Sequence, residues 1–142
     1  MTPEKTKIII ATHGELACAF LAAVETIIGR QSAVSCISLL AGDAPQTFRG
    51  KLISEIAANA SSLILVDIPG GTPWNVASAL ASHATVMASP ATSIRVVSGV
   101  NLSMLIELLL AGQGLTVDQL ADLAVKSGIE AITASRHPEA TG

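Results

Sequence analysis

The sequence predicts a single α/β domain with an open, doubly wound and mainly parallel sheet. Short runs rich in Ile, Val and Leu alternate along the chain with longer, alanine-rich segments of helical pattern. Nearly continuous apolar strands are typical of a sheet covered on both faces, and the alternating order is typical of parallel sheets. The 142 residues contain no evident repeat or linker, so one domain over 1–142 is expected, with a core over 6–134 and a polar tail over 135–142.

Each predicted element has a recognisable composition. The strands are the short aliphatic runs Lys7–Thr12, Val34–Leu39, Leu63–Asp67 and Ile94–Ser98. The helices are the longer segments Glu15–Ile28, Pro45–Ala60, Pro73–Ala84, Leu102–Ala111 and Val117–Ser127. Ile129–Thr133 has the composition of a short final strand, and Ala84–Ser93, rich in Ala, Ser and Thr, is expected to be a loop.

Composition argues against a membrane span and against nucleic-acid binding. Half of the residues are hydrophobic and only 13% are charged, but the longest stretch without charge, Ile68–Ile94, is interrupted by prolines and glycines. A spanning helix needs roughly 20 predominantly apolar residues. The formal net charge is −3, whereas a nucleic-acid-binding protein normally has a basic surface that contacts the phosphate backbone. The short apolar run near the N-terminus does not resemble a signal peptide, so the cytoplasm is the expected compartment.

The cysteines and histidines give no indication of a metal centre. Cys18 and Cys36 lie in apolar segments without CxxC spacing, and we expect them to be small buried thiols in a reducing compartment. No cluster of His, Cys, Asp and Glu has the spacing of metal ligands, so neither a metal nor another cofactor is expected. His83, in a helical tail, and His137, in the polar terminus, are expected to be solvated.

Two polar residues stand at the ends of predicted strands. His13 follows the first strand, and Asp67 ends the third. Ligands of open parallel sheets bind beyond the carboxyl ends of the strands, so these side chains are the candidate catalytic pair. A carboxylate that accepts a hydrogen bond from one ring N–H leaves the other imidazole nitrogen free as a nucleophile or base. The alternatives are a polar turn residue for His13 and a cap for Asp67.

The segment after Asp67 is a candidate phosphate site. Two glycines allow close backbone approach to an anion, and Pro73 suits the first turn of a helix. Helix N-termini bind phosphate through free N–H groups and the helix dipole. Gly71 and Thr72 are therefore the expected phosphate-binding residues, although such a run is also common at simple loop-to-helix junctions.

The other residues beyond these strand ends are expected to form a surface for partner proteins. They are Pro69, Gly70, Trp74, Asn75, Gly99 and Asn101. Trp74, the only tryptophan, has the alternative role of a core anchor.

Three ordered motifs resemble a known family. They read Ile-Ile-Ile-Ala-Thr-His-Gly through His13, Leu-Val-Asp-Ile-Pro-Gly-Gly-Thr-Pro-Trp-Asn-Val-Ala-Ser through Asp67, and Ser-Gly-Val-Asn-Leu-Ser-Met-Leu-Ile-Glu from Ser98. They look like the enzyme IIA domain of the mannose/fructose/sorbose class of the bacterial phosphoenolpyruvate-dependent sugar phosphotransferase system. The resemblance extends from Lys7 to about Ala134.

The resemblance implies a function, partners and an assembly. His13 would accept a phosphoryl group from the carrier protein HPr and pass it to enzyme IIB, which serves a membrane sugar permease. Asp67 would be the hydrogen-bond partner of His13, and Thr72 stands where the family often has serine. Members form homodimers that exchange a C-terminal strand, which would give Ile129–Thr133 an antiparallel place in a partner's sheet.

Other functions are compatible with the fold class. A receiver-like phosphoaspartate switch would use Asp67, but it needs an acidic pair after the first strand, where this chain has His13 and only Glu15 nearby. A nucleotide- or flavin-binding module needs a glycine- or Ser/Thr-rich loop there, which Thr-His-Gly-Glu-Leu matches poorly. A non-catalytic interaction module remains an alternative if His13 is not reactive.

Overall fold

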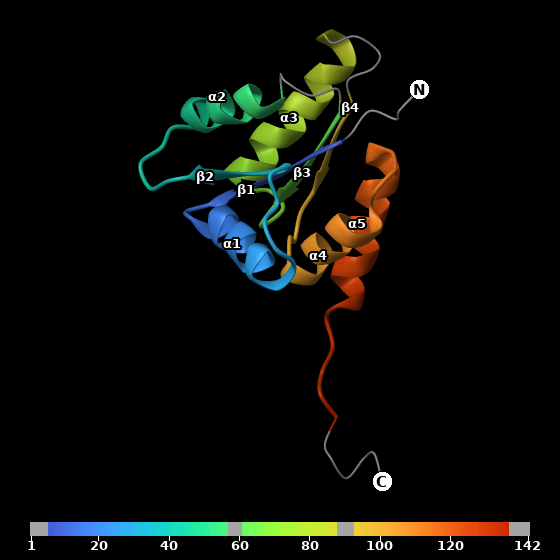
Figure 1. Cartoon of the computed structure of the whole chain (residues 1–142). Helices are drawn as coiled ribbons and strands as arrows, with labels where there is room; N and C mark the ends of the chain where they lie inside the picture. Colours follow the sequence, from blue (N-terminus) through green and yellow to red (C-terminus); the bar gives the residue numbers. More distant parts are fainter. Residues whose placement is uncertain (1–5, 57–60, 88–92, 137–142) are drawn as a thin grey trace.

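The computed structural model describes residues 6–56, 61–87 and 93–136, and it confirms the predicted alternation of strands and helices (Figure 1). The strands are β1 (Lys7–His13), β2 (Val34–Leu39), β3 (Ser61–Val66) and β4 (Ser93–Val97). The helices are α1 (Leu16–Ile28), α2 (Pro45–Ile56), α3 (Thr72–Met87), α4 (Leu102–Ala111) and α5 (Val117–Glu130).

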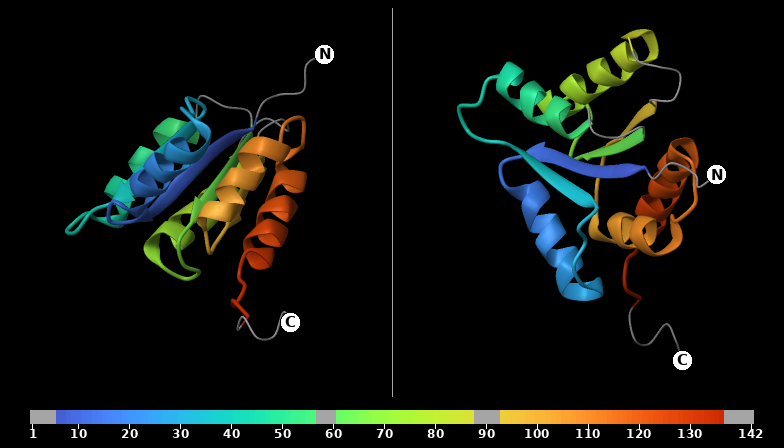
Figure 2. Two further views of the ribbon diagram at one scale, coloured as in Figure 1. Left: turned by 60° about the horizontal axis from the view of Figure 1, so that its bottom comes forward. Right: turned by 45° about the horizontal axis from the view of Figure 1, so that its top comes forward.

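The four strands form one parallel sheet in the order β2-β1-β3-β4. The central strand β1 is in register with both neighbours, so that Ile10 lies between Cys36 of β2 and Leu65 of β3. Helices α2 and α3 cover one face, and α1, α4 and α5 cover the other, as the right-hand view of Figure 2 shows. The predicted doubly wound α/β fold is therefore confirmed.

Alternation along the strands divides the core into two layers. Ile10 and Leu65 point toward α1, α4 and α5, where they join Leu105 of α4 in one buried cluster. Ile9 and Ile64 point the other way and pack with Phe48 of α2. Each fully buried side chain of this size contributes about 1.5–3 kcal/mol relative to exposure. This two-sided burial explains why half of the residues are hydrophobic in a chain with so few charges.

Side-chain caps determine where the last two helices begin. The Asn101 side chain accepts a hydrogen bond from the Met104 N–H at the start of α4. Thr116 and Gln119 exchange side-chain and backbone hydrogen bonds at the start of α5, a capping box. Such caps satisfy N–H groups that have no partner inside the helix.

The C-terminal segment differs from the sequence prediction. Helix α5 continues through Glu130, so the strand expected over Ile129–Thr133 is not formed in this chain. Continuation of the helix places Gly128 against Met104 of α4, a packing contact that local β-propensity does not reveal. The described residues after Ala131 are exposed, and the chain leaves the body of the domain there (Figure 1).

The segment expected to be a loop, Ala84–Ser93, is also partly regular. Helix α3 includes residues 84–87, and β4 begins at Ser93. Residues 88–92 lie outside the described part of the chain. The repeated Ala, Ser and Thr of this segment show no clear helical or strand periodicity. Alanine is nevertheless a strong helix former, and α3 continues through residues 84–87.

The prediction of two buried free thiols is wrong. Cys18 and Cys36 form a disulfide, Cys18 is exposed and Cys36 is half-buried. Packing of α1 beside the edge strand β2 brings their Cα atoms to 5.1 Å, inside the range of about 4.4–6.8 Å that a disulfide requires. The separation of 18 residues gave no sequence indication of this contact.

Gly50→Ala is expected to stabilise the protein by about 0.5–1 kcal/mol, because glycine in a helix interior loses more conformational entropy on folding than alanine does. Gly50 is exposed inside α2, and an added Cβ would meet no atom within 4 Å. The midpoint of urea unfolding should rise without a change in slope. A lower midpoint would contradict the open environment of this position.

Candidate functional site

The candidate site lies where the strand order changes direction. From β1 the chain moves outward to β2, then crosses β1 to reach β3, so β1 and β3 flank the switch point. Ligands of open α/β sheets bind in the crevice beyond the carboxyl ends of such strands. His13 is the last residue of β1, and Asp67 directly follows β3. The fold thus places the predicted catalytic pair side by side, although they are 54 residues apart.

Asp67 holds both the ring and the backbone of His13. His13 Nδ1 lies 2.8 Å from Asp67 Oδ2, and the His13 backbone N–H donates to the same oxygen at 3.1 Å. The Ile68 N–H donates to Oδ1 at 3.0 Å. Because an ionised carboxylate only accepts hydrogen bonds, these contacts assign the ring proton of neutral His13 to Nδ1. The lone pair is then on Nε2.

The two side chains differ in their exposure to solvent. The His13 side chain is 45% exposed, whereas that of Asp67 is 13% exposed. Burial alone raises the pKa of the Asp67 carboxyl group. Hydrogen bonds from the His13 ring and backbone, the His13 charge and the Ile68 N–H outweigh burial, so this pKa lies below its usual value.

The lowered pKa of Asp67 has a consequence for acid stability. A carboxyl group whose pKa falls on folding contributes stability that is fully present above its unfolded pKa, about 3.9. That contribution is lost as the pH falls through the lower folded value. The His13–Asp67 contact is therefore intact at neutral pH and weakens only in strong acid.

Asp67→Asn should slow any reaction of His13 by roughly 10²-fold, because an amide no longer assigns the ring proton to Nδ1 and no longer balances positive charge on the imidazole. The cost in stability at neutral pH should be about 1–2 kcal/mol, because the His13 and Ile68 N–H groups donate to different oxygens of Asp67 and the amide has only one acceptor oxygen. Single-turnover rates and urea unfolding measure the two effects. An unchanged rate would remove Asp67 from the site.

Gly71 lies against the imidazole ring. A Cβ built there would be 2.9 Å from His13 Cε1 and 3.4 Å from Nε2. The preceding Gly70 has φ +80°, a conformation that side chains rarely adopt. Asn75 closes this turn, since its side chain donates to the Gly70 carbonyl and its N–H to the Gly71 carbonyl. Thr72 begins the 16-residue helix α3, whose N-terminus therefore opens beside Nε2.

The chain matches the model of the PTS system fructose IIA component family over residues 7–125. It belongs to this EIIA family. It is 33% identical over 131 residues to the mannose-specific EIIAB component of Escherichia coli K12, a match that covers 89% of this chain and 38% of that protein. It is 32% identical over 122 residues to the sorbose-specific EIIA component of Lacticaseibacillus casei, covering 84% and 83% of the two chains. This chain thus corresponds to only about two fifths of the E. coli relative.

A solved structure has the same architecture. The phosphotransferase system component EIIA from Streptococcus agalactiae superposes with a TM-score of 0.84 at 37% sequence identity, covering 92% of this chain and 97% of that one. The family resemblance indicated by the three motifs is thereby confirmed.

The residues expected to face partners lie around this EIIA site in different environments. Pro69 and Asn75 are exposed, whereas Trp74 is half-buried against the core layer of α2 and α3. The Gly99 N–H donates to the Asp67 carbonyl, which ties the turn after β4 to the end of β3. Asn101 caps α4 and also donates to the Gly128 carbonyl. Trp74, Gly99 and Asn101 line a groove between β4 and α5.

Two features of the EIIA site were not predicted from the sequence. Leu16, Leu40 and Ile68 are 43%, 44% and 52% exposed, and each lies within three residues of the end of a strand. A large aliphatic side chain within three residues after a strand end is a sequence signal that could have identified them. The second feature is the buried hydroxyl of Thr12, which accepts a hydrogen bond from the Ala17 N–H.

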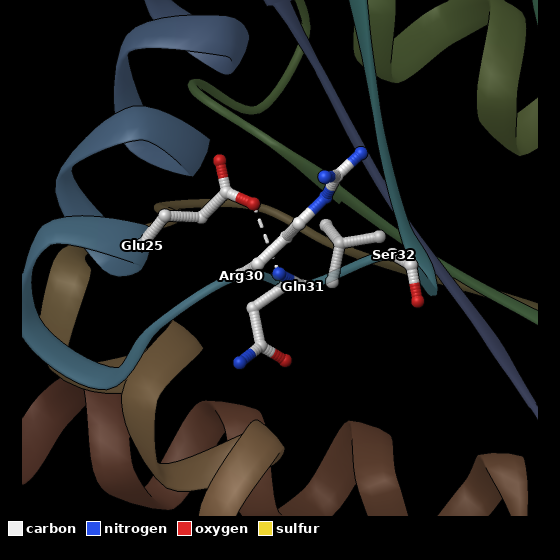
Figure 3. Close-up of a pocket in the computed structure, with 5 residues that line it drawn as sticks. Glu25, Arg30, Gln31 and Ser32 are labelled. Atoms are coloured by element: carbon white, nitrogen blue, oxygen red, sulfur yellow. Dashed lines mark hydrogen bonds between the residues drawn. The ribbon is translucent and has the colours of Figure 1, made fainter.

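A polar hollow lies at the amino-terminal end of β2, away from the candidate site, and is lined by Glu25, Arg30, Gln31 and Ser32 (Figure 3). There the Gln31 N–H donates to Glu25 Oε2 at 2.9 Å, which fastens the connection between α1 and β2. No group of His, Cys, Asp and Glu within 6–56, 61–87 and 93–136 could hold a metal ion.

His83 is exposed on α3, and His137 lies outside the described residues. Within the described part of the chain, no helix is both long enough and apolar enough to cross a membrane.

Proposed function

We propose that this EIIA chain is a phosphohistidine carrier, which accepts a phosphoryl group from HPr on Nε2 of His13 and passes it to an enzyme IIB during sugar uptake. The observation that supports it most directly is the His13–Asp67 contact of 2.8 Å, which occupies Nδ1 and leaves Nε2 as the nucleophile. The family membership supports the same conclusion, because the relatives are named as PTS EIIA or EIIAB components.

The proposed step needs only the residues of this site. The Nε2 lone pair attacks the phosphorus atom of phosphorylated HPr, a P–N bond forms at His13, and the bond between phosphorus and HPr breaks with its electron pair on HPr. The Nδ1 proton stays on the ring, and the Asp67 carboxylate balances the positive charge that develops there. N–H groups at the start of α3 and the Thr72 hydroxyl would stabilise the transferring oxygens. Transfer to enzyme IIB reverses these events with a new acceptor.

The exposed aliphatic side chains offer a docking surface for both partners. Leu16, Leu40 and Ile68 come from the segments that follow β1, β2 and β3, so they lie at the same end of the sheet as His13. We propose that HPr and enzyme IIB bind this surface in turn, together with Pro69, Gly70 and the neighbouring partner residues named above. A relay requires fast release, so a small interface below about 1,200 Å² is expected.

Chemical stability of the phosphorylated protein tests the proposal. Incubation with phosphoenolpyruvate, enzyme I and HPr should label the chain, and the label should be labile in acid and stable in base, as a phosphoramidate is. A base-labile label would indicate an acyl phosphate on Asp67 and would support the receiver-like alternative. Failure of the folded protein to take up label would contradict the carrier function. Addition of a matching enzyme IIB should then discharge the label.

We also propose that two copies of the chain associate through their C-terminal segments. Strand β4 is at the edge of the sheet, and Ile132 beyond α5 is 79% exposed on a segment that leaves the body of the domain (Figure 1). An extended segment can pair with the free edge of β4 in a second copy.

The molar mass in solution tests this association. Ile132→Asp should shift the mass from a dimer to a monomer in size-exclusion chromatography with light scattering. Ile27→Asp is the matched control, since Ile27 is 58% exposed on α1 and should leave the mass unchanged. A wild-type monomer at micromolar concentration would refute the association without affecting the carrier function.

A further inference from the structure

Thr12 is a fully buried polar residue directly before His13. Its relative exposure is 0%, and its hydroxyl makes two hydrogen bonds. Oγ1 accepts from the Ala17 N–H at 2.7 Å and donates to the His13 carbonyl at 3.2 Å. Strand alternation places Thr12 on the α1 side of β1, opposite the side chain of His13. The hydroxyl therefore joins the end of β1 to the first turn of α1.

Both peptide groups of His13 are thus held by side chains. Asp67 binds its N–H from the β3 side, and Thr12 binds its carbonyl from the α1 side. The next residue, Gly14, has φ +58° and donates its N–H to the Leu39 carbonyl of β2 at 2.7 Å. The turn that carries the imidazole is consequently attached to β3, β2 and α1 at separate points.

We infer that Thr12 is a positioning residue for phosphoryl transfer, whose hydroxyl orients the His13 peptide so that Nε2 faces Gly71 and the start of α3. The inference rests on the proposed carrier function. Asp67 fixes the ring only through Nδ1 and the N–H on one side of the residue. Without the Thr12 hydroxyl, the His13 carbonyl and the first turn of α1 lose their common attachment, and the peptide can tilt about the Asp67 contacts.

A hydroxyl differs from a mere packing group at this position. Valine has the shape of threonine and would fill the same volume, but it would leave the Ala17 N–H without its acceptor. That N–H belongs to the first turn of α1, which would move to find another acceptor. A displacement of about 1 Å at a reacting group can cost 10²-fold in rate.

Two substitutions separate the hydroxyl from packing. Thr12→Val keeps the volume and removes the hydroxyl, whereas Thr12→Ser keeps the hydroxyl and removes a methyl group. We expect Thr12→Val to lower the single-turnover rate of phosphorylation by HPr roughly 10–100-fold, with Thr12→Ser within about threefold of wild type. Saturation with HPr should not restore the rate of the valine variant, because a misdirected Nε2 slows the transfer step itself. Circular dichroism verifies that both variants are folded at the assay temperature.

A second readout needs no partner protein. Imidazole ¹⁵N shifts of folded His13 should show the proton on Nδ1 in wild type and Thr12→Ser, and a mixture of tautomers in Thr12→Val. Equal tautomer populations and equal rates in the two variants would overturn the inference, as would a rate loss in Thr12→Ser as large as that in Thr12→Val. If the wild type accepts no phosphate, the carrier function fails, while the tautomer comparison still decides the role of Thr12.

Discussion

His13→Gln is expected to abolish phosphoryl transfer to this chain. Glutamine can still donate a hydrogen bond to Asp67, but its amide nitrogen has no available lone pair to attack phosphorus. Removal of the nucleophile from a hydrolytic enzyme can lower the rate by about 10⁶-fold. Labelling with phosphoenolpyruvate, enzyme I and HPr measures the effect, and the label should be undetectable in the variant.

The control for this experiment is His83→Gln. His83 is also exposed, but it lies on α3 outside the site, so labelling of this variant should equal that of wild type. The fold should survive both changes, because neither side chain belongs to the buried core. Undiminished labelling of His13→Gln would require a different phosphoryl acceptor and would end the assignment of His13.

Gly71→Ala is expected to lower the rate of phosphorylation by about 10²-fold, because the added methyl group needs space that the imidazole occupies. The new Cβ would lie 2.9 Å from His13 Cε1, closer than such atoms can approach, and 3.3 Å from the Ile68 side chain. The ring must move, and its movement lengthens the 2.8 Å contact with Asp67. Single-turnover kinetics measure the loss.

The matched control is Gly50→Ala, which makes the same chemical change where nothing lies within 4 Å. Its phosphorylation rate should equal that of wild type. The backbone of Gly71 has no positive φ, so alanine introduces no strain there and the variant should remain folded. A normal phosphorylation rate in folded Gly71→Ala would show that the His13 ring can move aside without loss of reactivity. Gly71 would then not determine the geometry of the site.

Much of the fold follows from local pattern. The runs at Val34–Leu39 and Leu102–Ala111 have the boundaries that the sequence predicted. Leu102–Ala111 lies between Asn101 and Gly112, which mark the ends of a helix in the sequence. Val34–Leu39 is a short aliphatic run, the pattern typical of a strand buried in a parallel sheet. The third strand begins two residues earlier than predicted, at Ser61, because pairing with β4 extends to Ser93. Because serine is polar, the hydrophobic pattern of the sequence does not indicate this pairing.

Other features depend on contacts between distant segments. Local composition favoured a strand at Ile129, but packing of Gly128 against Met104 extends α5 through that position. The disulfide between Cys18 and Cys36 arises because α1 lies beside β2. Thr12 had no distinguishing feature in the sequence, since its role comes from an N–H five residues later that only the helix geometry brings within 2.7 Å.

The sequence alone determined the α/β class, the strand ends that carry His13 and Asp67, and the glycines before α3. These are consequences of periodicity and residue type, which are local properties of the chain. Only the tertiary structure decided which imidazole nitrogen is free, how closely Gly71 approaches it and which buried hydroxyl supports the histidine. Hydrogen bonds depend on distances of a few tenths of an ångström between segments far apart in the chain, and that information appears only when the sheet and its helices have packed.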